Sequence, residues 1–332
     1  MQFRLQLIGL LSSCIVVGSA QAYHPTDFES PLTRVAFGSC NRQNYSQPMW
    51  AVVAANEPDL WIWAGDNIYG DSTDPEVVQA KYHQQFEREE YTIFRTATPI
   101  IGTWDDHDYG SNDADRSYPI KAQTRDMALN FMEVPKDDPR RSREGIYGSY
   151  SFGPEGQRVK VLLLDGRYFS TGPKAVEPDL LGTAQRTWIE QQLTDSDAQV
   201  HLIVSGIQVL SSEHKYEKWA NFPADRKWLL DFIAEAQVPG VLFLTGDRHI
   251  HEISILEDER LSYPLIDITS SGLTHSWEKF KGEPNRYRFN SVYTGKGFGL
   301  LEFDWSDSKV SVKAMLRNET NETVNEVTLT LK

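Results

Sequence analysis

The sequence is poor in cysteine, since its 332 residues include only Cys14 and Cys40. Cys14 falls in an N-terminal segment with the features of a cleaved signal peptide, so a mature chain keeps one thiol and forms no internal disulfide. Such a thiol is a small buried apolar group, a metal ligand or a partner for another chain. Folding does not require a cross-link, because a chain of this length buries roughly three-quarters of its unfolded surface.

Positive charge is also scarce. The chain has 33 Lys and Arg residues against 47 Asp and Glu residues, for a formal net charge of −14, and we find no basic cluster. Such a surface repels a polyphosphate backbone, so we expect no nucleic-acid-binding surface. Apolar residues make up 40% and charged residues 24% of the chain. This is ordinary globular usage and excludes a disordered or fibrous protein.

Long hydrophobic runs are absent except at the N-terminus. Residues 5–17 are mainly apolar, Arg4 precedes them, and Ala20-Gln21-Ala22 follows as an A-x-A cleavage site. This pattern predicts a signal peptide over residues 1–22 and a secreted or periplasmic protein. Lipid anchoring at Cys14 is the less favoured alternative, because the apolar run continues past the cysteine towards the A-x-A site. No other run approaches the roughly 18 residues of a membrane span, so we expect no integral membrane segment after cleavage.

The rest of the sequence consists of short apolar runs that alternate with helical patterns, which is typical of the α/β class. We find no internal repeat or long linker, and we therefore expect residues 23–332 to form a single domain. The predicted strands are Thr33–Ser39, Leu60–Ala64, Ile100–Trp104, Val159–Leu164, Val200–Ser205, Val241–Thr245, Leu265–Thr269, Leu300–Phe303, Val310–Met315 and Val324–Leu331, and the predicted helices are Pro75–Glu89, Lys121–Glu133, Thr183–Thr194 and Ala224–Ala236.

Chemically active side chains directly follow five of the apolar runs. In open α/β sheets, ligands bind outside the carboxyl ends of the strands, so these five segments are expected to meet at one polar site. The segments are Cys40-Asn41, Gly65-Asp66-Asn67-Ile68-Tyr69, Asp105-Asp106-His107-Asp108, Asp165-Gly166-Arg167 and Gly246-Asp247-Arg248-His249-Ile250-His251.

The mixture of carboxylate, imidazole, amide, phenol and thiol groups suits a site that holds more than one metal ion. Asp66 has two carboxylate oxygens with which to bridge two ions, and two neighbouring cations orient a phosphoryl group and activate water. Cys40 and Tyr69 favour a transition metal, whereas Asp and Asn oxygens also accept calcium. Cysteine-based acyl transfer through Cys40 is the rival chemistry, but it leaves the Asp-rich turns without a role.

Five motifs span most of the chain in order, and a sixth segment, Ser270–His275, follows them. The motifs are FGSCN (Phe37–Asn41), GDNIYGD (Gly65–Asp71), TWDDHDYGSND (Thr103–Asp113), LLLDGRY (Leu162–Tyr168) and LTGDRHIHE (Leu244–Glu252). Together they resemble the motifs of the PhoD-like alkaline phosphatase D family, within the metallophosphatase superfamily.

The resemblance implies a four-layer α/β/β/α sandwich with a metal site at the strand ends. It also implies hydrolysis of small phosphorylated substrates, with iron and calcium as cofactors and zinc or manganese as alternatives. By motif, it implies that His107 and Asp106 act on the reacting groups and that Arg167 binds phosphate oxygens as a two-pronged donor. The implied metal ligands are Cys40, Asp66, Tyr69, Asn112, Asp247 and His249.

Several alternatives remain open. Asp106 or Asp108 is an alternative to Asn112 as a metal ligand. We expect a phosphatase acting on monoesters, with diesters as a second substrate class. A phosphodiesterase or phospholipase D-like hydrolase on the same fold is the alternative activity. A non-catalytic phosphate- or metal-binding protein is the alternative outside the enzyme class.

Other residues in the apolar runs are expected to be structural. Trp61 and Trp63 lie on the same face of one predicted strand, which indicates core packing. His201 lies within an apolar strand, where a histidine with satisfied hydrogen bonds is expected. Asp105 is expected to cap the end of its strand, because adjacent residues of an extended chain point in opposite directions.

Overall fold

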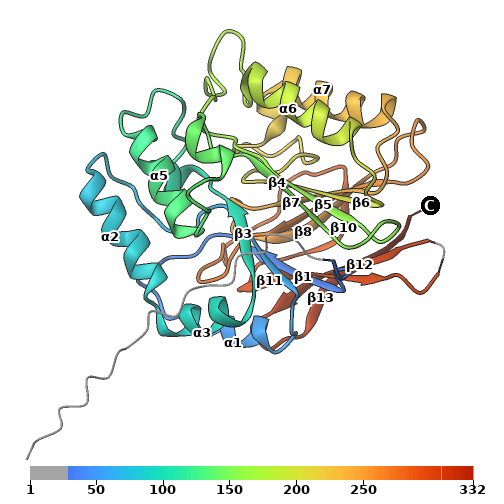
Figure 1. Cartoon of the computed structure of the whole chain (residues 1–332), viewed down its shortest axis with the longest axis horizontal. Coiled ribbons are helices and arrows are strands. Elements are labelled where there is room, and N and C mark those ends of the chain that lie inside the picture. The colour runs from blue at the N-terminus through green and yellow to red at the C-terminus, as the bar shows by residue number, and fades with distance from the viewer. Residues whose placement is uncertain (1–28, 308, 332) are drawn as a thin grey trace, which may run out of the picture.

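The computed structural model describes residues 29–307 and 309–331. Two large β-sheets lie face to face in the centre of the molecule, with helices on their outer faces (Figure 1). The signal peptide predicted over residues 1–22, and Cys14 with it, lie outside the described residues.

The first sheet has six strands in the order β13-β12-β11-β1-β2-β3. Strands β1, β2 and β3 are parallel, and the three C-terminal strands extend the sheet from β1 in antiparallel fashion. The bounds are β1 Arg34–Gly38, β2 Leu60–Ala64, β3 Ile100–Thr103, β11 Gly297–Asp304, β12 Ser311–Asn318 and β13 Thr323–Thr330.

The second sheet has seven strands in the order β10-β8-β9-β7-β6-β5-β4. Its four central strands β5, β6, β7 and β9 are parallel, whereas β4, β8 and β10 run antiparallel to their neighbours. The bounds are β4 Gly148–Phe152, β5 Val159–Leu163, β6 Val200–Ser205, β7 Val241–Thr245, β8 His251–Leu256, β9 Leu265–Ser270 and β10 Arg288–Tyr293.

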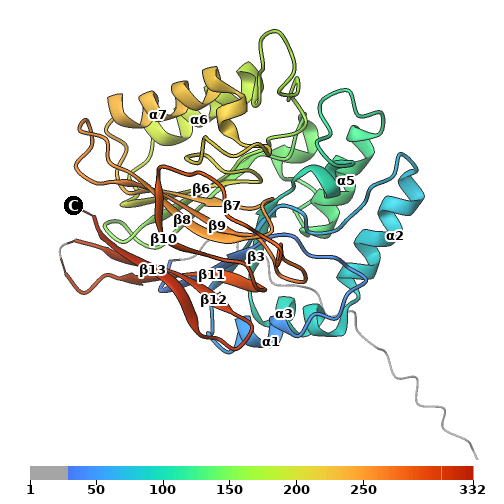
Figure 2. The same ribbon diagram turned by 180° about the vertical axis from the view of Figure 1, so that it is seen from behind.

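Helices cover the outer face of each sheet, and Figure 2 shows the same layers from behind. The first sheet packs against α1, α2, α3 and α5, and the second against α6 and α7. The four-layer α/β/β/α prediction is therefore confirmed. The bounds are α1 Met49–Ala54, α2 Pro75–Phe86, α3 Glu89–Ala97, α4 Asp106–Tyr109, α5 Lys121–Phe131, α6 Gly182–Thr194 and α7 Pro223–Glu235, with short 3-10 helices at Pro139–Ser142 and Trp219–Asn221.

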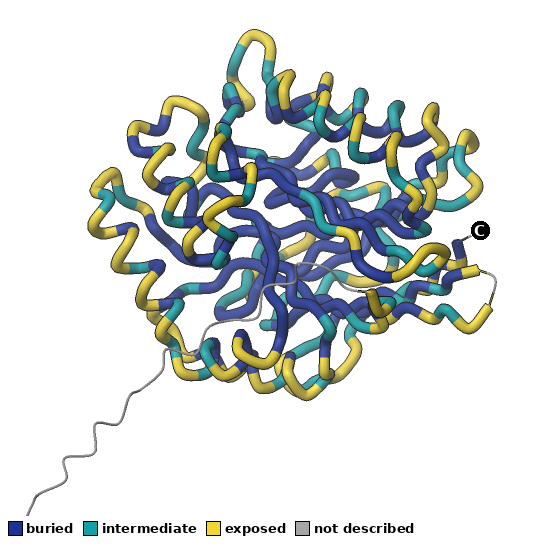
Figure 3. The backbone as a smooth tube through the Cα atoms, in the orientation of Figure 1, coloured by how far each residue is buried: buried dark blue, intermediate teal, exposed yellow. Residues whose placement is uncertain are grey.

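Apolar side chains from both sheets fill the space between them, which is why the strands are the most buried part of the chain (Figure 3). Trp61 and Trp63 instead face the helices below the first sheet. Both indoles pack edge-on against Trp50 of α1, at centroid distances of 5.0 and 5.2 Å. Their predicted role in core packing is confirmed.

The carboxyl ends of the two sheets touch at one place, which we call the seam. Ser39, after β1, forms a parallel bridge with Ser271, after β9. The Thr103 hydroxyl donates to the Leu164 carbonyl over 2.6 Å, joining the ends of β3 and β5. Gly246 makes the close approach possible, because a Cβ there would lie 2.5 Å from the Ser39 hydroxyl oxygen. All five predicted polar segments lie beside this seam.

The predicted strands are present, with ends shifted by a few residues at most. The helix predicted over Pro75–Glu89 ends at Phe86, and a separate helix, α3, begins at Glu89. Strands β4, β8 and β10 were not predicted. Among the helices of the described part of the chain, none has the length and apolar character needed to cross a membrane.

Candidate active site

The residues that turn away from the strand ends have unusual backbone conformations. Cys40, Asp66, Asp247 and His249 have φ angles of 60°, 51°, 65° and 54°. This left-handed region costs a non-glycine residue ~1 kcal/mol or more, and such strain clusters at functional sites. Gly65 adds a close approach, since its φ is 93° and a Cβ there would lie 2.5 Å from the Asp105 Cβ. Rigid packing thus holds four candidate ligands in conformations that the chain alone disfavours.

Cys40, Asp66, Tyr69 and His249 meet in one group. The Cys40 Sγ lies 3.4 Å from the Asp66 Oδ2 and 3.0 Å from the Ser271 Oγ. The Tyr69 hydroxyl donates to the same Asp66 oxygen over 3.2 Å and lies 3.0 Å from the His249 Nε2. The thiol, carboxyl, phenol and imidazole predicted to share a metal ion are therefore adjacent.

Asp106 and Asp247 extend this cluster. Candidate ligand atoms form three groups, within each of which all atoms lie no more than 4.8 Å apart. Asp66 and Asp106 each belong to two of the groups, and Asp66, which joins the Cys40 and His249 group to the Asp106 and His107 group, is in the position expected of a bridging carboxylate. The groups are Cys40 with Asp66 and His249, Asp66 with Asp106 and His107, and Asp105 with Asp106 and Asp247.

The acidic groups of this cluster lie so close together, and are so well buried, that the pKa values of most of them are raised. Burial, and then the neighbouring Cys40 and carboxylates, raise the pKa of Asp66 well above its usual value. Burial and Asp106 raise the pKa of Asp247 to about 7, and burial raises the pKa of the Cys40 thiol to about 12. Acids packed this closely ionise together only when a cation compensates them. The donor set and its unmet negative charge therefore fit bound metal ions.

His249 and Asp106 have protonation states suited to such a centre. Burial lowers the pKa of His249, which favours the neutral imidazole that binds metals. Burial alone would raise the pKa of Asp106. The Arg167 guanidinium, His107 and the backbone amide of Asp113 outweigh it, so the pKa of Asp106 is lowered. Asp106 thus favours the ionised form.

His107 lies in the first turn of α4, beside Asp66. Its backbone amide donates to the Asp106 Oδ1 over 2.8 Å, and its Nδ1 lies 2.6 Å from the Asp71 Oδ1. Burial would lower the pKa of His107, but the hydrogen bond to Asp71 and the surrounding carboxylates raise it. Because Nδ1 is engaged, Nε2 is the ring atom left for proton transfer. The imidazole ring also packs on the Tyr69 ring at a centroid distance of 4.2 Å.

Arg167 is fully buried behind the cluster rather than on an open surface. Its guanidinium donates from Nε to the Asp105 Oδ1 over 2.7 Å, and its Nη2 pairs with Glu217 at 2.6 Å. Its role as a phosphate ligand stays a prediction. Asp105 was expected to cap its strand end. It lies at the N-cap position of α4 and also forms the ion pair with Arg167.

Asn112 and Asp108, the alternatives for one ligand position, lie in different environments. Both carboxylate oxygens of Asp108 accept hydrogen bonds from backbone amides. The Asn67 amide donates to one oxygen over 3.0 Å, and the Asp105 amide donates to the other over 2.6 Å. Asn112 is exposed and lines the pocket described next. Asp108 is thus occupied in holding the loops, and Asn112 stays a prediction.

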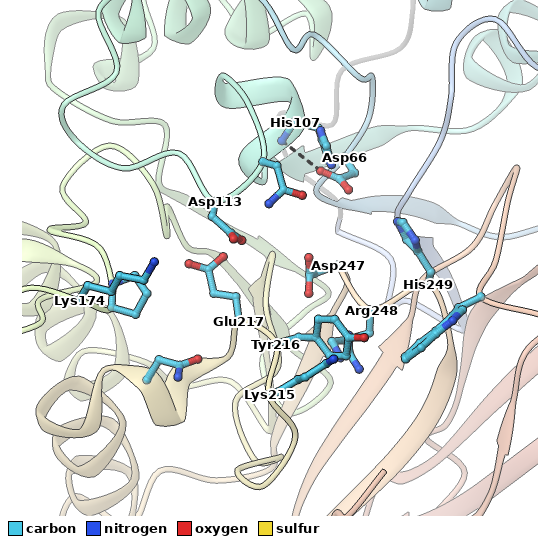
Figure 4. A pocket seen from close by; sticks show the side chains of 14 residues that line it. Asp66, His107, Asp113, Lys174, Lys215, Tyr216, Glu217, Asp247, Arg248 and His249 are labelled. Atoms are coloured by element: carbon cyan, nitrogen blue, oxygen red, sulfur yellow. Dashed lines mark hydrogen bonds between the residues drawn. The ribbon is translucent and has the colours of Figure 1, made fainter. Parts of the chain in front are cut away.

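A pocket of about 720 Å³, the central pocket, opens above the cluster. Asp66 and His107 lie on one side, Tyr216 and Arg248 on the other, and Asp247 between them (Figure 4). The pocket is lined by Asp66, His107, Asn112, Asp113, Pro173, Lys174, Lys215, Tyr216, Glu217, Asn221, Asp247, Arg248, His249 and Trp277.

Several residues of this site were not among the predicted catalytic, substrate-binding or metal-ligating residues. The His275 Nε2 lies 3.0 Å from the Tyr69 hydroxyl, and its ring packs edge-on against His249. The only available signal was the resemblance of the Ser270–His275 loop. Tyr216 and Glu217 follow no recognisable motif. Their place in the pocket depends on a loop that the local sequence does not reveal.

The comparisons with known proteins agree on one family. The model of the family described as PhoD-like phosphatase matches residues 35–283. Alkaline phosphatase D of Bacillus subtilis (strain 168) is 22% identical over 289 residues, which cover 70% of this chain and 48% of the relative. The chain thus spans about half the length of that curated relative.

Two solved structures share the fold. The structure of PhoD covers 92% of this chain and 70% of its own chain, with 17% identity and a TM-score of 0.72. GAP50, the anchor in the inner membrane complex of Plasmodium, covers 91% of this chain and 90% of its own, with 13% identity and a TM-score of 0.61. At these identities the structures support the fold, and the family model, which matches most of the chain, shows that the chain belongs to the PhoD-like phosphatase family.

Proposed function

We propose that this chain hydrolyses phosphate esters of small molecules, monoesters first and diesters as a second class, with bound metal ions. The observation that carries the proposal is Asp66, shared by two groups of candidate ligands on the floor of the central pocket, with His107 beside it. The fold by itself is not sufficient support, since one protein with this fold is described as an anchor.

The metal ions would be held by Cys40, Asp66, Tyr69, Asp247 and His249, with Asn112 as a further ligand. A thiol and a phenol in one group favour iron, and the carboxylate-rich remainder favours calcium, with zinc or manganese as alternatives. When bound, such ions would supply positive charge to the phosphate oxygens and activate the attacking water.

His107 is the residue best placed to move a proton. Asp71 holds its Nδ1 at 2.6 Å and the pKa of the ring is raised, so the imidazolium persists towards neutral pH. A protonated Nε2 at the pocket wall would donate to the leaving-group oxygen as the ester bond breaks. Asp106 accepts the His107 backbone amide and so holds the main chain that carries the ring.

A panel of phosphate monoesters and diesters, assayed alongside metal analysis of the purified protein, tests this function. We expect monoesters to give the higher kcat/KM and chelation of the metal to abolish turnover. His107→Asn should retain the metal and lose about 100-fold or more in kcat. A metal-free protein that is fully active, or a metal-loaded one inactive on every ester, would contradict the proposal.

Colour provides a separate test of the iron assignment. Thiolate and phenolate ligands donate charge to ferric iron, so the purified protein should absorb visible light, and Cys40→Ser should lose the colour and most of the activity. Cys40 is fully buried. Resistance of its thiol to labelling is therefore expected with or without metal and cannot diagnose coordination. A colourless protein with full activity and no iron would refute the assignment.

We also propose that the protein is exported by the N-terminal signal predicted over residues 1–22. The support is the sequence pattern alone. Mass spectrometry of the mature N-terminus after expression tests it: we expect Tyr23 as the first residue, whereas an intact or lipid-modified terminus would contradict cleavage there.

A further inference from the structure

A second pocket of about 520 Å³ adjoins the central pocket. Lys215, Tyr216 and Trp277 line both pockets, so the two are neighbours across a shared wall. No motif and no part of the proposed mechanism uses this second pocket. A group bound there would lie next to whatever occupies the central pocket.

The second pocket carries positive charge on a chain whose formal net charge is −14. Lys215, Lys279 and Lys281 line it and are exposed, and among the described residues none of the three has an ion-pair partner. Its two acidic residues, in contrast, are already paired: Glu213 with Arg286, and Glu283 with Arg248. The pocket therefore attracts an anion despite the overall charge of the protein.

His214 is the second observation that points to a ligand. It lines the pocket and is only 3% exposed, and neither of its ring nitrogens has a hydrogen-bond partner among the described residues. A buried imidazole without partners costs free energy unless a bound group satisfies it. Burial, and then nearby Arg248, lowers its pKa, so the ring is neutral and its N–H can donate to an anion.

The wall between the pockets is aromatic and firmly held. The Tyr216 and Trp277 rings pack edge-on at a centroid distance of 5.4 Å. The Arg248 guanidinium lies 4.3 Å from the centre of the Tyr216 ring, and Glu283 fixes it from the other end. Such a wall suits an uncharged linking segment between two anionic groups.

We propose that the second pocket is a leaving-group subsite that binds a second anionic group, a phosphate or a carboxylate, carried by the alcohol portion of the substrate. The proposal rests on the proposed hydrolysis of phosphate esters in the central pocket. It specifies the substrate class as phosphate esters with a negative charge at both ends, the linking segment lying over Tyr216 and Trp277.

Matched substrates test the subsite. Hexanediol bisphosphate and phosphooxyhexanoate carry a second anion, and hexyl phosphate of the same chain length does not. We expect wild-type kcat/KM to be about tenfold higher for at least one of the charged-tail esters than for hexyl phosphate. A series from ethanediol to octanediol bisphosphate should show one optimal length, because a fixed site demands a fixed span.

Two variants and one control follow. We expect the double variant Lys279→Gln/Lys281→Gln to lose most of the preference for charged tails. The single variant His214→Phe should lose it as well. Lys136 is an exposed lysine on another loop, so Lys136→Gln should keep the preference. Equal rates for charged and neutral tails in the wild type, or a preference that survives in the lysine double variant, would overturn the subsite.

Failure of the subsite can be told apart from failure of the proposed function. If no ester is hydrolysed, the proposed function fails, and calorimetric binding of hexanediol bisphosphate against hexyl phosphate still tests the subsite. Tighter binding of the bisphosphate that is lost in the lysine double variant supports it, and equal binding overturns it. If hexyl phosphate is hydrolysed as well as the charged-tail esters, the function stands and the subsite fails.

Discussion

The cluster below the central pocket, which we call the floor (Cys40, Asp66, Asp106 and Asp247), and the second pocket beside it carry groups of opposite charge. The floor buries Cys40, Asp66 and Asp106 and brings them beside the half-buried Asp247, and acids packed this closely ionise together only when a cation compensates them. The second pocket presents lysines to solvent without acidic partners, because its own glutamates are paired elsewhere. This difference supports the two proposals, that the floor holds cations and that the second pocket binds the anionic end of a substrate.

Removing a carboxylate from the floor should have the largest effect. We expect Asp66→Asn to lower kcat/KM by roughly 1,000-fold or more and to reduce metal content, because Asp66 belongs to two ligand groups. The exposed Asp137→Asn serves as the matched control and should change neither quantity. Near-normal turnover of Asp66→Asn with its metal retained would remove the floor from the proposed site.

Substitution of Arg167 tests whether its buried guanidinium only stabilises the fold or also binds the substrate. Arg167→Lys replaces a fork that pairs with Asp105 and Glu217 by a point charge, so we expect a loss of about 2 kcal/mol of unfolding free energy and a roughly tenfold higher KM. Denaturant unfolding and steady-state kinetics measure the two effects.

Glu217→Gln sharpens this prediction. If the guanidinium must leave Glu217 to bind phosphate, weakening that contact should lower the KM. If Arg167 only holds Asp105 in place, both variants should change stability and leave the KM as it is. The second outcome would withdraw Arg167 from the substrate-binding residues.

The smallest expected effect concerns His201, a buried histidine with both ring nitrogens satisfied, unlike His214. Its Nδ1 lies 2.7 Å from the Pro239 carbonyl and its Nε2 2.7 Å from the Ser196 hydroxyl, which confirms the structural role predicted for it. Burial lowers its pKa from the usual value of 6.5 to about 4.

Between these two pH values the unfolded chain binds the extra proton, so His201 destabilises the fold as the pH falls from 6.5 towards 4. The contribution is at most ~1.4 kcal/mol per pH unit. His201→Gln should therefore flatten the pH dependence of the unfolding free energy in this range, as measured by urea titration at several pH values. An unchanged slope would mean that His201 is protonated in the folded state.

The sequence was sufficient for the central strands and for most of the floor. Runs such as Leu60–Ala64 are wholly apolar, and the motifs after them contain the candidate ligands. Strand β10, in contrast, has the polar sequence RFNSVY at a sheet edge and carries no apolar run. Arg167 was expected to bind phosphate because its motif resembles that of the family. Its pairing with Glu217 could not be predicted, because Glu217 lies 50 residues further along the chain and no local sequence signal joins the two.

The second pocket could not be predicted for a similar reason. Its residues come from two loops, one around His214 and one around Lys279, which are separated by the strands β7, β8 and β9. No short motif joins them, and the chain as a whole is acidic. Only the folded arrangement shows that Glu213 and Glu283 are paired, whereas Lys215, Lys279 and Lys281 have no ion-pair partner among the described residues.

The seam between the sheets has a consequence for the thermodynamics of folding. Cys40 and Asp66 follow strands of the first sheet, whereas Asp247 and His249 follow β7 of the second, and the Ser39–Ser271 bridge is one of the contacts that join the sheets. An ion held by residues from both sides acts as a cross-link that exists only in the native state. Thermal stability should then depend on free metal concentration, rising by about 2.7 kcal/mol at 100 times the dissociation constant. Metal supply would thereby set the lifetime of the folded protein as well as its activity.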